Sequence, residues 1–159
     1  MKNHLIVVGV DGSDSGRRAL EWAAREAAGR DTAVQAVLAW SWDGVEADVL
    51  TATSPEEEHR QATAVLERQV QAVIAEHGSH LPIAAETVEG RPADVLIAMA
   101  RSADLLVLGS HGHSRLRHSV LGSVSEACIR RATCPVVVIP THLGEPVPDR
   151  EPAVRTAQR

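Results

Sequence analysis

The chain has 159 residues and a formal net charge of −5, from 16 basic and 21 acidic side chains. This length suits a single domain with its own core, and the acidic balance argues against a nucleic-acid binder, which needs clustered lysine and arginine. Phenylalanine and tyrosine are absent, so the core must be aliphatic.

The location is predicted from what the sequence lacks. No stretch approaches the roughly 18 apolar residues that a membrane span needs, and the apolar run at residues 5–8 is too short for a signal peptide. The two cysteines are too few for a disulfide framework. We therefore expect a cytoplasmic protein with reduced, buried thiols and no membrane partner.

The first half of the chain predicts two strands and two helices. Residues 5–10 are a β-branched apolar run, typical of a strand buried on both faces. A helix should follow the polar turn at 11–16 and stop at Gly29, and residues 33–40 predict the second strand. Residues 41–53 show no period and predict a surface loop. Ser54 then begins a helix with a capping box, which Gly78 ends.

The second half repeats the alternation of strand and helix. Strands are predicted at 82–88, 104–108 and 135–139, with helices from Pro92 to about Arg101 and from Gly122 to Ala132. Arg91 stands where a helix cap is expected and weakens that helix start. Residues 1–140 should form the domain, and the proline-containing residues 141–159 a mobile polar tail.

This alternation predicts an α/β fold. We expect an open, mostly parallel five-stranded sheet of Rossmann-like type, with helices on both faces and right-handed crossovers. With the strands in the order 3-2-1-4-5, the loops after the first and fourth strands meet at the switch point, where such sheets bind ligands.

The most specific motif is Gly109-Ser110-His111-Gly112, followed after nine residues by Gly122-Ser123-Val124-Ser125. The glycines let the backbone approach an anion closely. A helix that begins at Gly122 would offer free amides and a positive dipole end to phosphate. The alternative is a flexible Gly-Ser loop before a capped helix, and spacing alone leaves both open.

These residues resemble the ATP-binding branch of the universal stress protein family. That family's motif is Gly, two residues, Gly, nine residues, Gly, then Ser or Thr, and it is matched at every position. The segments 6–13, 103–109, 122–126 and 134–139 are also similar to the family in sequence and order. The resemblance extends from about residue 4 to residue 140 and implies the adenine-nucleotide α-hydrolase-like version of the fold.

The resemblance implies a role for each matched residue. Asp11 would lie by the ribose and adenine, with Gly9 and Val10 lining the base pocket and Trp40 packing against the base. The ribose and phosphates would contact Leu108, Gly109, Gly112, Gly122, Ser123, Val124 and Ser125. The resemblance also implies ATP with Mg²⁺ or Mn²⁺, and a dimer built through the last strand.

One stretch departs from the family. His113, Ser114, Arg115, Arg117 and His118 replace a segment that is often glycine-rich, which predicts a bulkier and more basic cover over the phosphates. His111, His113 and His118 have no cysteine or carboxylate beside them at ligand spacing, so we expect no metal site built by the protein alone.

Catalysis has little support in the sequence. There is no Gly-Lys-Ser/Thr loop and no evident base to activate water. We therefore expect a homodimeric, nucleotide-dependent stress-response or regulatory protein, not an enzyme, with slow ATP hydrolysis at most. One alternative is an adenylating or ATP-hydrolysing enzyme of the α-hydrolase group, but residues 10–15 lack the first Ser and the first Gly of its Ser-Gly-Gly-x-Asp-Ser loop. The other is a dimerisation module without nucleotide, against which the glycine motif counts.

The final strand predicts the dimer contact. Val136, Val137, Val138 and Ile139 form an apolar run whose two faces should both be covered. As the last strand of an open sheet it leaves one backbone edge unpaired, and the proline-rich tail is unsuited to covering it. A second copy of the chain would satisfy this edge through a two-fold contact.

Overall fold

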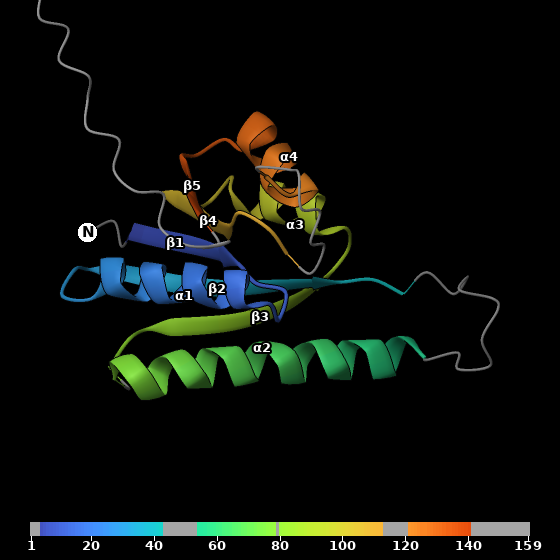
Figure 1. Ribbon diagram of the computed structural model, residues 1–159, viewed down its shortest axis with the longest axis horizontal. Helices are drawn as coiled ribbons and strands as arrows, with labels where there is room; N and C mark the ends of the chain where they lie inside the picture. Colours follow the sequence, from blue (N-terminus) through green and yellow to red (C-terminus); the bar gives the residue numbers. More distant parts are fainter. Residues whose placement is uncertain (1–3, 43–53, 79, 113–120, 141–159) are drawn as a thin grey trace, which may run out of the picture.

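A computed structural model of the chain describes residues 4–42, 54–78, 80–112 and 121–140, and within these it shows a parallel five-stranded sheet (Figure 1). The strand order β3-β2-β1-β4-β5 confirms the predicted order. The elements are, in chain order, β1 (His4–Gly9), α1 (Asp14–Ala27), β2 (Thr32–Trp40), α2 (Pro55–His77), β3 (Ile83–Glu89), α3 (Pro92–Met99), β4 (Leu105–Gly109), α4 (Ser123–Arg131) and β5 (Val136–Ile139).

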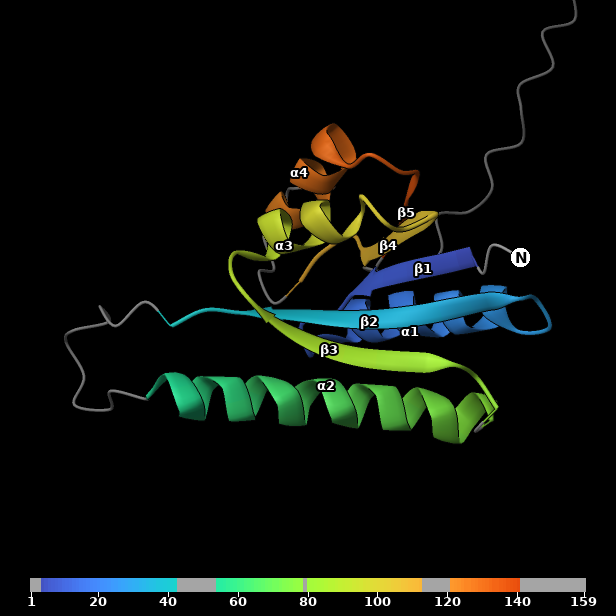
Figure 2. The same ribbon diagram turned by 180° about the vertical axis from the view of Figure 1, so that it is seen from behind.

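Helices cover both faces of the sheet. Figures 1 and 2 show α2 on the side of the sheet opposite α3 and α4, and α1 shares a core with α2. Alternate residues of a strand point to opposite faces, so Val8 of β1 packs with Leu20 of α1 and Leu66 of α2. Its neighbour Val7 packs with Leu96 of α3 and Cys128 of α4. Two aliphatic cores therefore sandwich the sheet.

The helix ends largely follow the sequence predictions. The Ser54 hydroxyl accepts a hydrogen bond from Glu57 N at 3.2 Å, which is the capping interaction predicted for α2. Helix α1 ends at Ala27, and Gly29 has the positive φ of +72° that a residue with a Cβ rarely adopts. Arg91 gives α3 no side-chain cap, as expected.

Other expectations were less exact. Helix α3 is shorter than predicted, because the amides of Arg101 and Ser102 bond to the nearer carbonyls of Ala98 and Met99 in a tightened turn. Most of the predicted loop at 41–53 and the whole tail at 141–159 lie outside the described residues. Within the described residues, no helix has both the length and the apolar content to span a membrane.

Strand β5 is half-buried, and each of its two faces packs against one of the two cores. Val136 packs against the α3–α4 core, while Val137 and Ile139 pack against the α1–α2 core. Among the described residues β5 pairs only with β4, so its outer edge has no strand partner there.

Cys128 and Cys134 are free thiols, as expected. Cys128 is fully buried in the α3–α4 core, and this burial raises the pKa of its thiol from 9.0 to about 11. Cys134 is half-buried, and burial also raises the pKa of its thiol.

We predict that the free energy of unfolding falls as the pH rises from about 9 to 11. Across this range Cys128 ionises in the unfolded chain but stays protonated in the folded one, so alkali favours unfolding. The raised pKa of Cys134 adds a slope of the same sign. Other groups interfere little, because the chain has no tyrosine and Lys2 is its only lysine. Urea unfolding of the reduced protein at pH 8 to 11 measures the effect. The Cys128→Ala variant should lose most of the pH slope, and an unchanged slope would contradict the assignment.

Candidate functional site

A cavity of about 420 Å³ opens where β1 and β4 end, between the starts of α1, α3 and α4. Its volume lies within the usual range for small-molecule sites. Ten of the thirteen residues singled out from the sequence line it, namely Gly9, Val10, Asp11, Leu108, Gly109, Gly112, Gly122, Ser123, Val124 and Ser125. The structure thus brings the two predicted loops together at the switch point.

Trp40 does not line this cavity, so the expectation that it packs against a ligand there is wrong. Its ring stacks on His59 of α2, with centroids 5.0 Å apart and planes 19° from parallel. The cause is the two-residue period of β2: Val37 and Ala39 face the cavity, and Trp40 faces the opposite side of the sheet. The other two candidates, His113 and Ser114, lie outside the described residues.

The backbone of β2 reaches beyond the end of β1. The last hydrogen bond between these strands runs from Val10 N to Val37 O, at 2.9 Å. Ala39 is the next residue of β2 whose amide and carbonyl point to that side, because Trp40 O already accepts Gly90 N from the side of β3. No hydrogen bond joins Ala39 to the described residues beyond β1. One donor and one acceptor are therefore directed into the cavity.

Asp11 is held in place by the turn that begins α1. One carboxylate oxygen, Oδ1, accepts hydrogen bonds from the Ser13 amide at 3.0 Å and from the Ser13 hydroxyl. The same hydroxyl accepts a hydrogen bond from Gly16 N at 3.2 Å and so caps the helix. The carboxylate therefore lies at the positive end of the α1 dipole, which stabilises its negative charge.

The glycines of the loop after β4 are explained in part by the packing of the chain itself. A Cβ on Gly109 would overlap the Ser15 hydroxyl and lie 2.8 Å from the Ser15 carbonyl carbon. A Cβ on Gly112 would overlap the second carboxylate oxygen of Asp11. Glycine at both positions lets the loop after β4 approach α1 and Asp11, so the motif serves folding as well as any ligand.

The start of α4 offers three amides at the cavity. The first bond inside the helix runs from Glu126 N to Gly122 O, at 3.0 Å, and Gly122 has no side chain to cap the amides of Ser123, Val124 and Ser125. The helix start is nevertheless fixed in place. The Ser125 hydroxyl donates to Gly109 O at 2.7 Å, and Gly122 N donates to Ser110 O at 2.7 Å.

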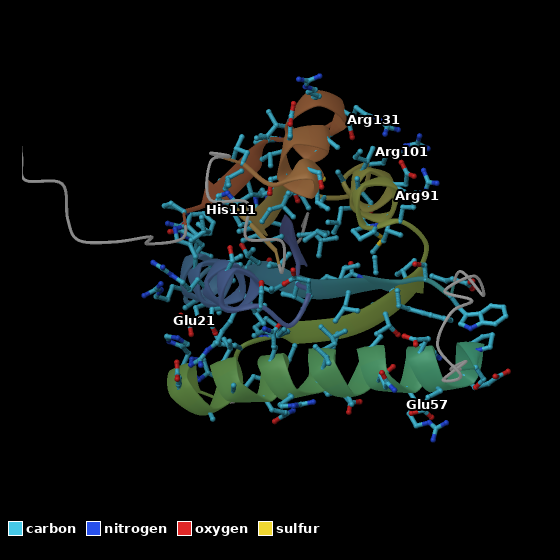
Figure 3. All side chains as sticks on the ribbon, turned by 45° about the vertical axis from the view of Figure 1, so that its right-hand side comes forward. Glu21, Glu57, Arg91, Arg101, His111 and Arg131 are labelled. Atoms are coloured by element: carbon cyan, nitrogen blue, oxygen red, sulfur yellow. The ribbon has the colours of Figure 1, made fainter. Side chains whose placement is uncertain are left out.

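The charged groups of the cavity are mainly acidic. Asp11 and Glu126 contribute carboxylates, and His111 is the only basic type among the described lining residues. Figure 3 shows Arg91, Arg101 and Arg131 on the outer surface of the α3–α4 layer, where all three are exposed. Among the described residues, positive potential for an anion therefore comes chiefly from the start of α4.

The residues that sequence reasoning missed supply the walls of the cavity. They include Val37 and Ala39 from β2, Pro92 and Leu96 from α3, and Glu126 from α4. The apolar side chains among them, those of Val37, Ala39, Pro92 and Leu96, carry no sequence signal that distinguishes a cavity wall from a core. No group of three or more His, Cys, Asp or Glu side chains within the described part of the chain is arranged to hold a metal ion.

Comparison with known proteins agrees with this geometry. The universal stress protein family matches residues 2–140. Universal stress protein Rv2005c of Mycobacterium tuberculosis is 36% identical over 144 residues, which cover 87% of this chain and 48% of that protein. The chain thus spans about half the length of the curated relatives it matches.

Two similar structures contain nucleotides. A universal stress protein in complex with cAMP is 29% identical, with a TM-score of 0.64 over 86% of this chain and 96% of that one. The universal stress protein of Archaeoglobus fulgidus in complex with dAMP is 28% identical, with a TM-score of 0.62 over 87% and 98%. With a family match over nearly its whole length, a shared fold and the same loops meeting at the switch point, this chain belongs to the universal stress protein family.

Proposed function

We propose that this protein binds ATP in the cavity at the carboxyl ends of β1 and β4 and acts as a homodimeric, nucleotide-dependent stress-response protein of the cytoplasm. The observation that carries the proposal is the meeting of two complementary backbone features in one cavity. The uncapped start of α4 suits phosphate, and the free edge of Ala39 suits a base.

The free edge of Ala39 favours adenine over guanine. Adenine has an acceptor at N1 beside the donor of its 6-amino group, so the Ala39 amide can donate to N1 while its carbonyl accepts from the amino group. Guanine presents the reverse pattern, with a donor at N1 and an acceptor at O6. The apolar side chains of Val37, Leu96 and Pro92 would contact the faces of the base.

The start of α4 would hold the phosphates through the amides of Ser123, Val124 and Ser125 and the Ser123 hydroxyl. Because Asp11 and Glu126 are acidic, a triphosphate needs further positive charge. Oxygen ligands of this kind suit Mg²⁺ or Mn²⁺. Such an ion would be bound mainly by the phosphates and water. Asp11 and Glu126 are the carboxylates beside it, although Glu126 Oε1 already accepts a hydrogen bond from Arg130 at 2.6 Å. Arg115 and Arg117 are a second source of charge that the sequence offers.

The nucleotide complexes of relatives support adenine as the base, because cAMP and dAMP both contain it. We propose the triphosphate for this chain because its glycine motif matches the ATP-binding branch in full. We propose binding without catalysis as its primary activity, since the sequence has no Gly-Lys-Ser/Thr loop.

The first prediction from the proposed function concerns the end of the cavity that would hold the phosphates. Gly122→Glu should weaken ATP binding by about tenfold or more, because it adds a carboxylate beside the amides that would hold phosphate. Gly122→Ala is the matched control: its Cβ makes the same close approach, 3.2 Å, to Ser110 O, but it carries no charge. Titration of labelled ATP against both variants and the wild type measures the effect. Equal affinity of the Glu and Ala variants would rule out phosphate at the start of α4.

A second prediction concerns the base. ATP should compete with labelled ATP at least about tenfold better than GTP does, because guanine would leave both polar groups of Ala39 facing like groups. If GTP competes as well as ATP does, Ala39 does not read the base.

The third prediction concerns the dimer. The carbonyls of Pro135 and Ile139 accept bonds from Leu106 N and Ser110 N of the neighbouring chain segment, so Val136 and Val138 direct their backbone groups to the outer edge of β5. Val138→Pro therefore removes a donor from that edge and leaves the ladder to β4 intact. We expect a folded monomer from this variant and a dimer from the wild type in light scattering at micromolar concentration.

The control for the dimer is deletion of residues 141–159. If β5 pairs with β5 of a second copy, the shortened chain remains a dimer. A monomeric wild type, or a Val138→Pro variant that remains dimeric, would show that the outer edge of β5 is not the contact.

A further inference from the structure

A side chain from α2 reaches across to the turn between β1 and α1. Gln69 donates a hydrogen bond from Nε2 to the Ser13 carbonyl oxygen at 3.0 Å, although the two residues are 56 positions apart. Helices α1 and α2 lie next to each other, with α2 along β3 (Figure 1). A second link between these helices is the exposed ion pair of Arg17 with Glu76. Arg17 also pairs with Glu21, which Figure 3 labels where α1 lies beside α2.

Ser13 connects this bond to the cavity. Its amide and hydroxyl both donate to Asp11 Oδ1, and its hydroxyl also accepts Gly16 N. Its carbonyl accepts both Gln69 Nε2 and Arg17 N. Each polar group of Ser13 is therefore used, and Gln69 is the contact through which α2 fixes the residue that orients the Asp11 carboxylate.

The stability of the fold alone does not explain a glutamine at position 69. Its side-chain oxygen, Oε1, is shielded from solvent and has no hydrogen-bond partner within the described part of the chain. Turning the amide over would bring this oxygen against the Ser13 carbonyl oxygen, so the orientation is fixed by the bond that Nε2 makes. An unpaired buried acceptor destabilises the fold, and an apolar side chain beside Leu66, Val70 and Val73 would avoid it.

We infer that Gln69 is a positioning residue of the nucleotide site, which acts through Ser13 to hold the Asp11 carboxylate where the nucleotide binds. The inference rests on the proposed function, because it assigns Gln69 an effect on nucleotide affinity. It also explains why a side chain with an unpaired buried oxygen occupies the inner side of α2.

The test uses the full chain with Gln69→Met, which keeps the length of the side chain and removes its polar atoms. Ser13 O still accepts Arg17 N, at 3.0 Å, so no backbone group loses its last partner. We expect the Kd for ATP to rise about three- to tenfold, while the urea midpoint stays unchanged or rises because the unpaired oxygen is gone. The matched control is Gln71→Met, an exposed position on the same helix, which should change neither quantity.

A double-mutant cycle separates positioning from a general structural effect. If Gln69 acts through Asp11, Gln69→Met should have no further effect on the Kd in an Asp11→Ala background. Equal effects in both backgrounds, or parallel losses of affinity and stability, would overturn the inference. Equal ATP affinity of the wild type and Gln69→Met would overturn it while leaving the proposed function intact. A wild type that fails to bind ATP would instead refute the proposed function on which the inference rests.

Discussion

The hydrogen-bond ladder between β1 and β2 stops at the bond from Val10 N to Val37 O, while β2 continues to Trp40. Most features of the candidate site depend on this difference in length. Past Val10 the chain turns away through Asp11 and Ser13 into α1, and on the other side of β1 the loop after β4 diverges toward α4. A cavity remains at the switch point. At one side lies a stretch of β2 backbone that no described residue pairs with, and at the other lies the start of a helix.

At this site, folding and the proposed binding both restrict which residues can stand at the same positions. Gly109 and Gly112 are needed because Ser15 and Asp11 occupy the space that a Cβ would fill, so the glycine motif has a reason to exist without any ligand. The groups proposed to meet a ligand lie elsewhere, in backbone groups at Ala39 and at the start of α4 that have no hydrogen-bond partner among the described residues. The hydrogen bond from Gln69 to Ser13 leaves the Gln69 side-chain oxygen with no partner among the described residues, which we attribute to the same double requirement.

Most of the fold could be predicted from the sequence, because apolar β-branched runs, the Ser54 cap and Gly29 each have a local physical cause. The loops that form the site could also be predicted, from the spacing of their glycines. The face to which Trp40 points could not, because β2 is apolar on both faces and its pattern does not distinguish them. Ala39 would act through its backbone, and Gln69 is one polar residue on a largely polar helix, so neither proposed role had a sequence signal.

The most direct test of the account is amide hydrogen exchange, followed residue by residue by NMR with and without ATP and Mg²⁺. The account predicts slower exchange at Ala39, Ser123, Val124 and Ser125 when ATP is bound, because these amides would become donors to the base and the phosphates. The backbone amide of Gln71, a residue on the exposed face of α2, provides an internal reference that should not change. Protection confined to other parts of the chain, or none at saturating ATP, would contradict the proposed site.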